Sequence, residues 1–314
     1  MLFLSGIQDA LKRSSPIVIF FRKVRAWLTA SLIRVSPVLF LNIRYRAKRG
    51  KWPNLKEPHT FDEKLLWLNL YWQHPLKTRC ADKLNVRFYV MDHGLSHLLP
   101  EQLGVYKHSN EIVFGSLPES FVLKCTHGCG FNIICKSKAN LDVVETIKKL
   151  DAWINIDFSK VYGELHYAAI LPRIVCESFL EDPDFDLPTD YKVYCFNGKA
   201  YCTMVCTERT LNESAKYIFY DLEWKNELPF SKVDYLANKH IPKPAALEEM
   251  INAAQVLSKP FPFVRIDFFN IKDKVVFGEM TFTPAGCIDV EITDIAQAKF
   301  GGLIQLPEKR VITQ

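Results

Sequence analysis

The sequence predicts an α+β protein, in which antiparallel strand hairpins and separate helices share the core. In residues 264–268, apolar side chains alternate with Arg265 and Asp267, and a second apolar run follows the turn-forming residues 270–274; this is the period of a strand hairpin with one polar face. A second hairpin is centred on Asn197-Gly198, a dipeptide typical of tight turns. Residues 244–258 instead place Leu, Met, Ile and Ala at helical spacing. Strand and helix periods therefore occur in separate segments.

The other elements follow from caps, breakers and periodicity. Thr60, with Glu63 three residues later, forms a capping box that predicts the start of a helix ending before Pro75. A second helix is expected over residues 77–90. Further strands are expected at residues 121–124, 132–135, 173–180, 191–196, 200–207 and 217–220, and further helices at 140–149 and shortly after Pro284.

Residues 121–138 contain a candidate anion-binding loop. An apolar run ends in Lys124, the loop Cys-Thr-His-Gly-Cys-Gly follows, and a return strand begins at Asn132. Gly128 and Gly130 allow backbone amides to point at an anion, while Lys124 supplies a positive charge. The GK[ST] ending of a P-loop is missing. A glycine hairpin that only connects two strands is the alternative.

Residues 264–286 contain a candidate metal site. In the predicted hairpin Arg265 and Asp267 share a face, and Glu279 lies across from Asp267. Two carboxylates beside an arginine suit a hard cation with oxygen ligands, and such cations often carry phosphates. Gly278 allows another group to approach the backbone closely. A solvated hairpin with a surface ion pair is the alternative.

These motifs, taken in order, resemble the ATP-grasp superfamily, and more narrowly its TupA-like branch, which is found with teichuronopeptide and other bacterial surface-polysaccharide pathways. Each motif is loose alone, but the ordered set is specific and covers roughly residues 55–306. The matching segments are 61–64, 76–78, 81–83, 122–132, 190–192 with 195–198, and 264–283.

The resemblance implies nucleotide-binding roles for the first half of the set. Lys124 would hold the phosphates, and the loop of His127, Gly128, Cys129 and Gly130 would cover them. This loop departs from close relatives, which carry a small residue at position 129 and often glycine at 131, where this chain has phenylalanine. Further nucleotide contacts would come from the adenine hinge at Glu177 and Leu180 and from Asp190 at the ribose, with Glu181 or Asp182 as alternatives.

The resemblance also implies the catalytic and metal-binding residues. Lys192 would lie near the γ-phosphate, and Arg265 would steady the γ-phosphoryl group and an acyl phosphate. Asp267 and Glu279 would bind Mg²⁺. Thr281 stands where many ATP-grasp enzymes have an asparagine as third ligand, and its hydroxyl would be a weaker ligand that acts through water.

The charge is unevenly distributed along the chain. The 314 residues carry a formal net charge of +5, but residues 1–51 hold eleven Lys or Arg and one acid, so they carry +10 and the remainder −5. We expect four parts: a basic apolar helical segment (1–51), a helical N-terminal part (52–115), a small ATP-grasp subdomain with the glycine loop (116–180) and a large subdomain with the metal site (181–314).

The basic segment has no charge-free run long enough to span a bilayer, which takes about 20 apolar residues. Its bases also interrupt the pattern of a signal peptide. Two interpretations stay open and are compatible: helices that lie at an anionic membrane surface, or a helical cap packed on the body. The nine cysteines indicate reduced thiols in a cytoplasmic protein; a zinc site formed from Cys125, His127 and Cys129 and from Cys202 and Cys206 is the alternative.

The resemblance implies an ATP- and Mg²⁺-dependent carboxylate–amine ligase that forms an acyl phosphate and acts in capsule, O-antigen or teichuronopeptide biosynthesis. Expected partners are an amino acid or sugar acid, a lipid-linked saccharide and the inner face of the cytoplasmic membrane, but no nucleic acid. The first competing hypothesis is a glycosyltransferase of the same pathway, for which Asp182-Pro-Asp184 offers a formal DxD motif. The second is a non-catalytic membrane-docking protein, against which the intact Lys124, Asp267 and Glu279 argue.

Overall fold

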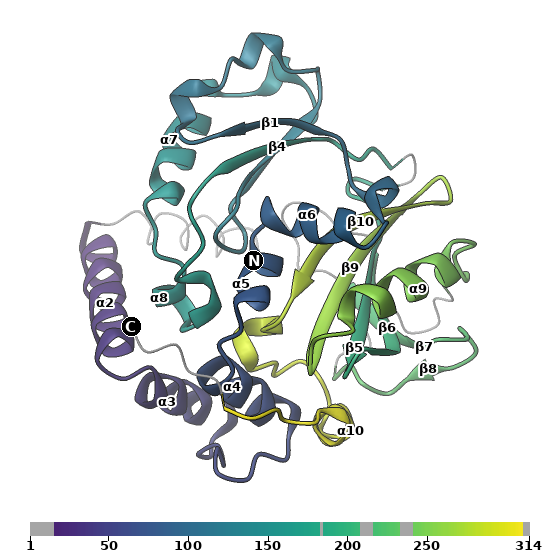
Figure 1. The fold of residues 1–314 in the computed structure, drawn as a ribbon. Helices are drawn as coiled ribbons and strands as arrows, with labels where there is room; N and C mark the ends of the chain where they lie inside the picture. Colours follow the sequence, from purple (N-terminus) through teal and green to yellow (C-terminus); the bar gives the residue numbers. More distant parts are fainter. Residues whose placement is uncertain (1–15, 183–184, 208–215, 233–240, 310–314) are drawn as a thin grey trace, which may run out of the picture.

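The computed structural model describes residues 16–182, 185–207, 216–232 and 241–309, and it confirms the α+β class (Figure 1). Two antiparallel sheets are flanked by helices. The helices are α2 (Pro16–Val35), α3 (Pro37–Arg49), α4 (Phe61–Tyr71), α5 (Pro75–Ala81), α6 (Asn85–Asp92), α7 (Val143–Ile154), α8 (Ser159–Tyr162), α9 (Leu247–Ser258) and α10 (Asp294–Leu303). The strands are β1 (Gln102–Tyr106), β2 (Phe121–Cys125), β3 (Asn132–Cys135), β4 (Ile174–Ser178), β5 (Asp190–Phe196), β6 (Lys199–Thr207), β7 (Lys216–Asp221), β8 (Glu227–Leu228), β9 (Phe263–Ile271) and β10 (Lys274–Thr281).

The smaller sheet has the strand order β1-β4-β2-β3. Strands β2 and β3 form the expected glycine hairpin, with Lys124 opposite Asn132. Strand β4 lies on the other side of β2 and places Glu177 opposite Val122. Helix α7 packs its buried Leu150 into a hydrophobic core of this sheet. Lys124 and Glu177 are therefore positioned by neighbouring strands.

The larger sheet has the strand order β10-β9-β5-β6-β7-β8. Both predicted hairpins are confirmed, and in each turn two successive residues have positive φ: Asn197 (49°) with Gly198 (77°), and Lys272 (51°) with Asp273 (63°). Such mirror-image turns match the right-handed twist of the strands. Helix α9 packs on strands β5, β6 and β9, and the register of β5 on β9 sets Lys192 opposite Asp267.

Helix α4 joins the N-terminal part to the larger sheet. Its capping box is present as predicted: the Thr60 hydroxyl accepts from the Glu63 amide, and the Glu63 carboxylate accepts from the Thr60 amide. Phe61, which is fully buried, lies with its ring centroid 5.0 Å from that of Phe263 on β9 and 5.3 Å from that of Phe300 on α10. One aromatic core therefore holds α4, the sheet and α10 together.

Residues 16–49 form the two helices α2 and α3. Leu41 and Tyr45 of α3 are buried in the main core, so α3 is part of the body. Trp27, Leu28 and Val35 of α2 are 66%, 54% and 83% exposed, and α3 also exposes Leu39 and Ile43. In the described part of the chain no helix has the length and apolar character to cross a bilayer.

The single helix expected over residues 77–90 is wrong, because the structure has two helices with a break at Asp82. Asp82 is extended (φ −76°, ψ 117°), and its carboxylate accepts hydrogen bonds from the amides of Leu84 and Asn85. An aspartate that bonds to following amides competes with a continuous helix. The break frees Lys83 from helical geometry, and its ammonium donates to the carbonyl oxygen of Gly128 in the glycine loop.

Candidate active site

A cavity of about 340 Å³ lies between the two sheets. The smaller sheet and its loop contribute Lys124, Cys129, Gly130 and Glu177, and residues that follow β4 contribute Leu180 and other apolar side chains. The larger sheet contributes Asp190, Lys192, Asp267 and Glu279. Charged groups from segments more than 100 residues apart are therefore brought to one cavity.

Asp267 and Glu279 are directly opposite each other on β9 and β10, as the sequence predicts. A β-bulge at Gly278 shifts the pairing register so that Glu279 lies opposite Asp267. The bulge position requires glycine, because a Cβ there would lie 2.9 Å from the carbonyl oxygen of Asp267. The Thr281 hydroxyl donates to the Glu279 carboxylate over 3.2 Å and accepts from Arg265, also over 3.2 Å. The oxygen-bearing side chains of the predicted metal site therefore form one connected group.

Arg265 and Lys192 flank the buried Asp267. The arginine donates from Nε (2.8 Å) and Nη2 (2.7 Å) to the two carboxylate oxygens, and the Lys192 ammonium lies 2.5 Å from Oδ2. The same ammonium also pairs with Asp190. Burial raises the pKa of Asp267, but the charges of Arg265 and Lys192 outweigh this effect and hold the pKa below its usual value.

Lys192 remains a cation in this environment. Burial alone lowers the pKa of its ammonium, but the charges of Asp190 and Asp267 outweigh burial and raise the pKa above its usual value. Two fixed cations, Arg265 and Lys192, thus stand beside the carboxylates of the larger sheet. Such fixed charges can stabilise a negative charge that develops in the cavity.

The smaller sheet carries a second chain of charges. The Lys124 ammonium lies 2.5 Å from Glu177 Oε2, and Arg87 Nη1 of α6 lies 3.0 Å from Glu177 Oε1. The Glu177 side chain is 8% exposed, whereas the Lys124 side chain is 23% exposed and faces the cavity. Glu177 therefore orients two cations through its carboxylate. The role in the adenine hinge that the resemblance implies for Glu177 and Leu180 stays a prediction.

The glycine loop is held by packing as well as by Lys83. A Cβ at Gly128 would lie 2.7 Å from the ring of Phe158, so this position has no room for a side chain. Phe131 stacks on Trp153 of α7, with centroids 5.5 Å apart. His127 is buried, its Nε2 lies 3.2 Å from the Trp153 carbonyl oxygen, and burial lowers its pKa. The imidazole therefore anchors the loop, and the cavity is lined by Cys129 and Gly130.

The sequence profile of the family described as TupA-like ATPgrasp matches residues 63–305, more than three quarters of the chain. The chain belongs to the TupA-like ATP-grasp family. This membership makes it an ATP-grasp enzyme whose cofactors are ATP and Mg²⁺. A search of curated proteins found no match.

Several solved structures resemble this TupA-like protein. D-alanine–D-alanine ligase from Bacillus anthracis in complex with ATP is 15% identical, with a TM-score of 0.45 over 72% of this chain and 64% of that one. An L-amino acid ligase from Bacillus licheniformis is 15% identical, with a TM-score of 0.42 over 66% and 44% of the two chains. The ATP-grasp ligase PsnB with its minimal precursor is 12% identical, with a TM-score of 0.38 over 70% and 60%. The TupA-like chain therefore spans less than two thirds of each.

The donor set of the TupA-like site fits Mg²⁺ bound together with a nucleotide. Among the described residues there is no group of three His, Cys, Asp or Glu side chains that could hold a metal ion by itself. Mg²⁺ is commonly held by one or two carboxylates and by phosphate oxygens. Asp267, Glu279 and the Thr281 hydroxyl would hold it in that way, and the metal would neutralise phosphate charge.

The sequence assigned no role to two residues that the structure places at the site, Lys83 and Arg87. Lys83 nevertheless lies in one of the segments that resemble the ATP-grasp superfamily. Lys83, in the segment 81–83, binds the glycine loop, and Arg87 binds Glu177. Both come from the region around the helix break, some 40 or more residues before the loop. A basic residue just after a helix-breaking aspartate is the only signal that the sequence contains, and it does not tell which loop the residue reaches.

Proposed function

We propose that this ATP-grasp enzyme is a carboxylate–amine ligase. The observation that supports this proposal best is the cavity in which Lys124 of one sheet faces Lys192, Asp267 and Glu279 of the other, with Arg265 bonded to Asp267. In the proposed reaction a substrate carboxylate oxygen takes the terminal phosphoryl group of ATP, and ADP leaves. The nitrogen of an amine then bonds to the acyl carbon and the amine loses a proton. The bond between the acyl carbon and the bridging oxygen breaks, so inorganic phosphate leaves and carries one oxygen of the former carboxylate.

The residues of the chain have separate tasks in this proposal. Lys124 holds phosphate oxygens from the smaller sheet while Glu177 and Arg87 fix its position. Arg265 and Lys192 stabilise the negative charge on the phosphoryl group during its transfer, and Asp267 holds both cations in place. Phosphoryl transfer depends mainly on such positioning and charge stabilisation. Leu180 and Asp190, which also line the cavity, would contact adenine and ribose.

The pathway and the substrates belong to the same proposal. We propose an amino acid or a sugar acid as the carboxylate, and an acceptor in bacterial surface-polysaccharide biosynthesis, in the cytoplasm. Purified protein incubated with ATP, Mg²⁺ and a panel of amino acids and sugar acids should release ADP and yield a product with the mass of the amide. Release of AMP, or hydrolysis of ATP without any mass gain across the panel, would contradict the ligase proposal.

MgATP should raise the melting temperature of the protein, because a ligand that binds only the native state stabilises it by mass action. A concentration about 100 times Kd contributes roughly 2.7 kcal/mol. UDP-sugars should give little shift. A shift with UDP-sugars and none with MgATP would favour the glycosyltransferase; its DxD motif includes Asp182, but positions 183–184 lie outside the described residues.

We further propose that α2 lies at an anionic membrane surface and brings the site to a lipid-linked saccharide. The exposed Trp27, Leu28 and Val35 of α2 and the exposed Leu39 and Ile43 of α3 offer apolar contacts, and each nearby base contributes up to about 1 kcal/mol at low salt. Because α3 is built into the core, substitution is a cleaner test than truncation.

Vesicles with phosphatidylglycerol should sediment the wild-type protein, less so at high salt. The variant Trp27→Ser/Leu28→Ser/Val35→Ser should bind several-fold more weakly. The control Val113→Ser/Leu171→Ser removes apolar side chains that are 66% and 70% exposed elsewhere and should bind like the wild type. Equal sedimentation of both variants would show that α2 is a structural cap.

A further inference from the structure

A second cavity, of about 540 Å³, lies away from the nucleotide cavity. It is formed by α3 and the residues that follow it, by α10, and by Lys232, which lies four residues beyond β8. It shares no lining residue with the cavity between the sheets. The catalytic proposal therefore leaves this cavity without a role.

The walls of this cavity are strongly basic. Lys48, Arg49, Lys51 and Lys232 line it, and Asp294 is the one acid among the lining residues of the described chain. Lys51 and Lys232 are exposed, and neither takes part in an ion pair among the described residues. Burial and then the charge of Arg44 lower the pKa of Lys48. Excess positive charge of this kind favours an anionic ligand.

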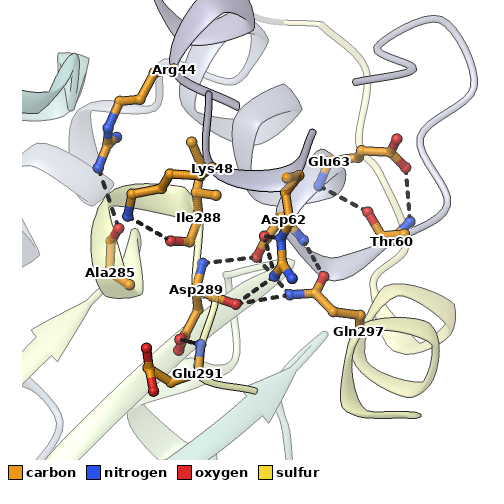
Figure 2. A network of polar contacts seen from close by, with 11 residues as sticks. Arg44, Lys48, Thr60, Asp62, Glu63, Ala285, Ile288, Asp289, Glu291 and Gln297 are labelled. Atoms are coloured by element: carbon orange, nitrogen blue, oxygen red, sulfur yellow. Dashed lines mark hydrogen bonds and ion pairs between the residues drawn. The ribbon is translucent and has the colours of Figure 1, made fainter. Parts of the chain in front are cut away.

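Two of the cations, Lys48 and Arg49, are fixed in place; Figure 2 labels Lys48 and the partner residues Asp62, Ile288 and Asp289. Arg49 donates from Nε and Nη2 to Asp62 over 2.9 and 2.6 Å, and its Nη2 also lies 2.5 Å from the Asp289 carbonyl oxygen. Lys48 Nζ donates to the Ile288 carbonyl oxygen over 3.1 Å. No hydrogen bond among the described residues uses Arg49 Nη1, so this group can still donate to a ligand. The cavity thus has fixed donors in its wall and two exposed lysines, Lys51 and Lys232, among its lining residues.

We propose that this cavity is a second anion-binding site, which takes a phosphate or pyrophosphate group. Arg and Lys donors from two separate segments, residues 48–51 and Lys232, can surround a tetrahedral anion with several oxygens, a geometry that these side chains commonly provide for phosphate. The volume leaves room for a further group attached to the phosphate. The site does not depend on the proposed ligase reaction, and its ligand chemistry could come from a soluble phosphate ester or from a lipid headgroup.

The test uses inorganic pyrophosphate and calorimetry on the full chain, with the nucleotide site saturated by a non-hydrolysable ATP analogue and Mg²⁺. The wild type should bind pyrophosphate, more weakly as salt increases. K51Q/K232Q should weaken binding at least about tenfold, since two charges are lost from the site. The control K199Q/K225Q removes two exposed lysines elsewhere and should leave the affinity unchanged.

The outcomes separate the two sources of the anion. Pyrophosphate binding that is lost in K51Q/K232Q supports a soluble phosphate ligand. If only vesicles with phosphatidylglycerol bind, and K51Q/K232Q but not K199Q/K225Q loses them, the ligand is a lipid phosphate and the site stands. Equal binding by both double variants, or no binding of either probe by the wild type, would overturn the proposal, whatever the outcome of the ligase assay.

Discussion

Glu279→Gln is expected to lower the rate of ADP formation at least about a hundredfold. The reason is that Mg²⁺ would lose an anionic ligand, and its stabilisation of the phosphate charge in the transition state is worth several kcal/mol. The Glu279 side chain is 41% exposed, and its polar contacts are a 3.2 Å hydrogen bond from the Thr281 hydroxyl and a 3.9 Å contact with Arg265, so the melting temperature should change little. Asp267→Asn should lower the rate by at least as much. It should also destabilise the fold, because Arg265 and Lys192 then lose their shared carboxylate.

Asp273→Asn is the matched control for these variants. Asp273 is exposed, lies in the turn of the same hairpin, and has φ of 63°, a conformation that asparagine adopts readily. Its rate of ADP formation should equal that of the wild type. Full activity in both Glu279→Gln and Asp267→Asn would remove the metal-site assignment.

The largest loss of stability is expected for Asp62→Ala. Asp62 is fully buried on α4, and its carboxylate accepts from Arg49 of α3, from Gln297 of α10 (2.9 Å) and from the Asp289 amide (3.2 Å) (Figure 2). Removing one partner of a buried ion pair leaves the other charge uncompensated, which costs about 3–5 kcal/mol. Urea denaturation should show a lower midpoint with an unchanged slope.

Asp92→Ala provides the comparison for this prediction. Asp92 pairs with Arg79 over 2.7 Å, but the side chains are 59% and 40% exposed, and exposed pairs contribute about 0–1 kcal/mol. The two variants remove the same chemical pair and differ in burial. If they lower the free energy of unfolding equally, the junction of α3, α4 and α10 does not depend on the buried aspartate.

Local rules in the sequence determined most of the elements. The Asn197-Gly198 turn, the alternation around Arg265 and Asp267, and the capping box at Thr60 depend on residues within one turn or one hairpin, and the structure confirms each of them. The opposition of Asp267 and Glu279 was expected from the same hairpin, but it depends on the bulge at Gly278, because pairing counted from the turn alone would set Gly278 opposite Asp267. The ordered set of motifs also sufficed to give the family.

Tertiary structure alone decided which distant groups meet. Asp82 interrupts a helix that periodicity predicts as continuous, and this break sends Lys83 to the Gly128 carbonyl oxygen. Arg49, which the sequence offers only as one of many bases, becomes the partner of Asp62 because α3 packs against α4. Neighbouring residues constrain backbone conformation and pairing register, but the packing of whole helices and sheets determines which charges share a buried site.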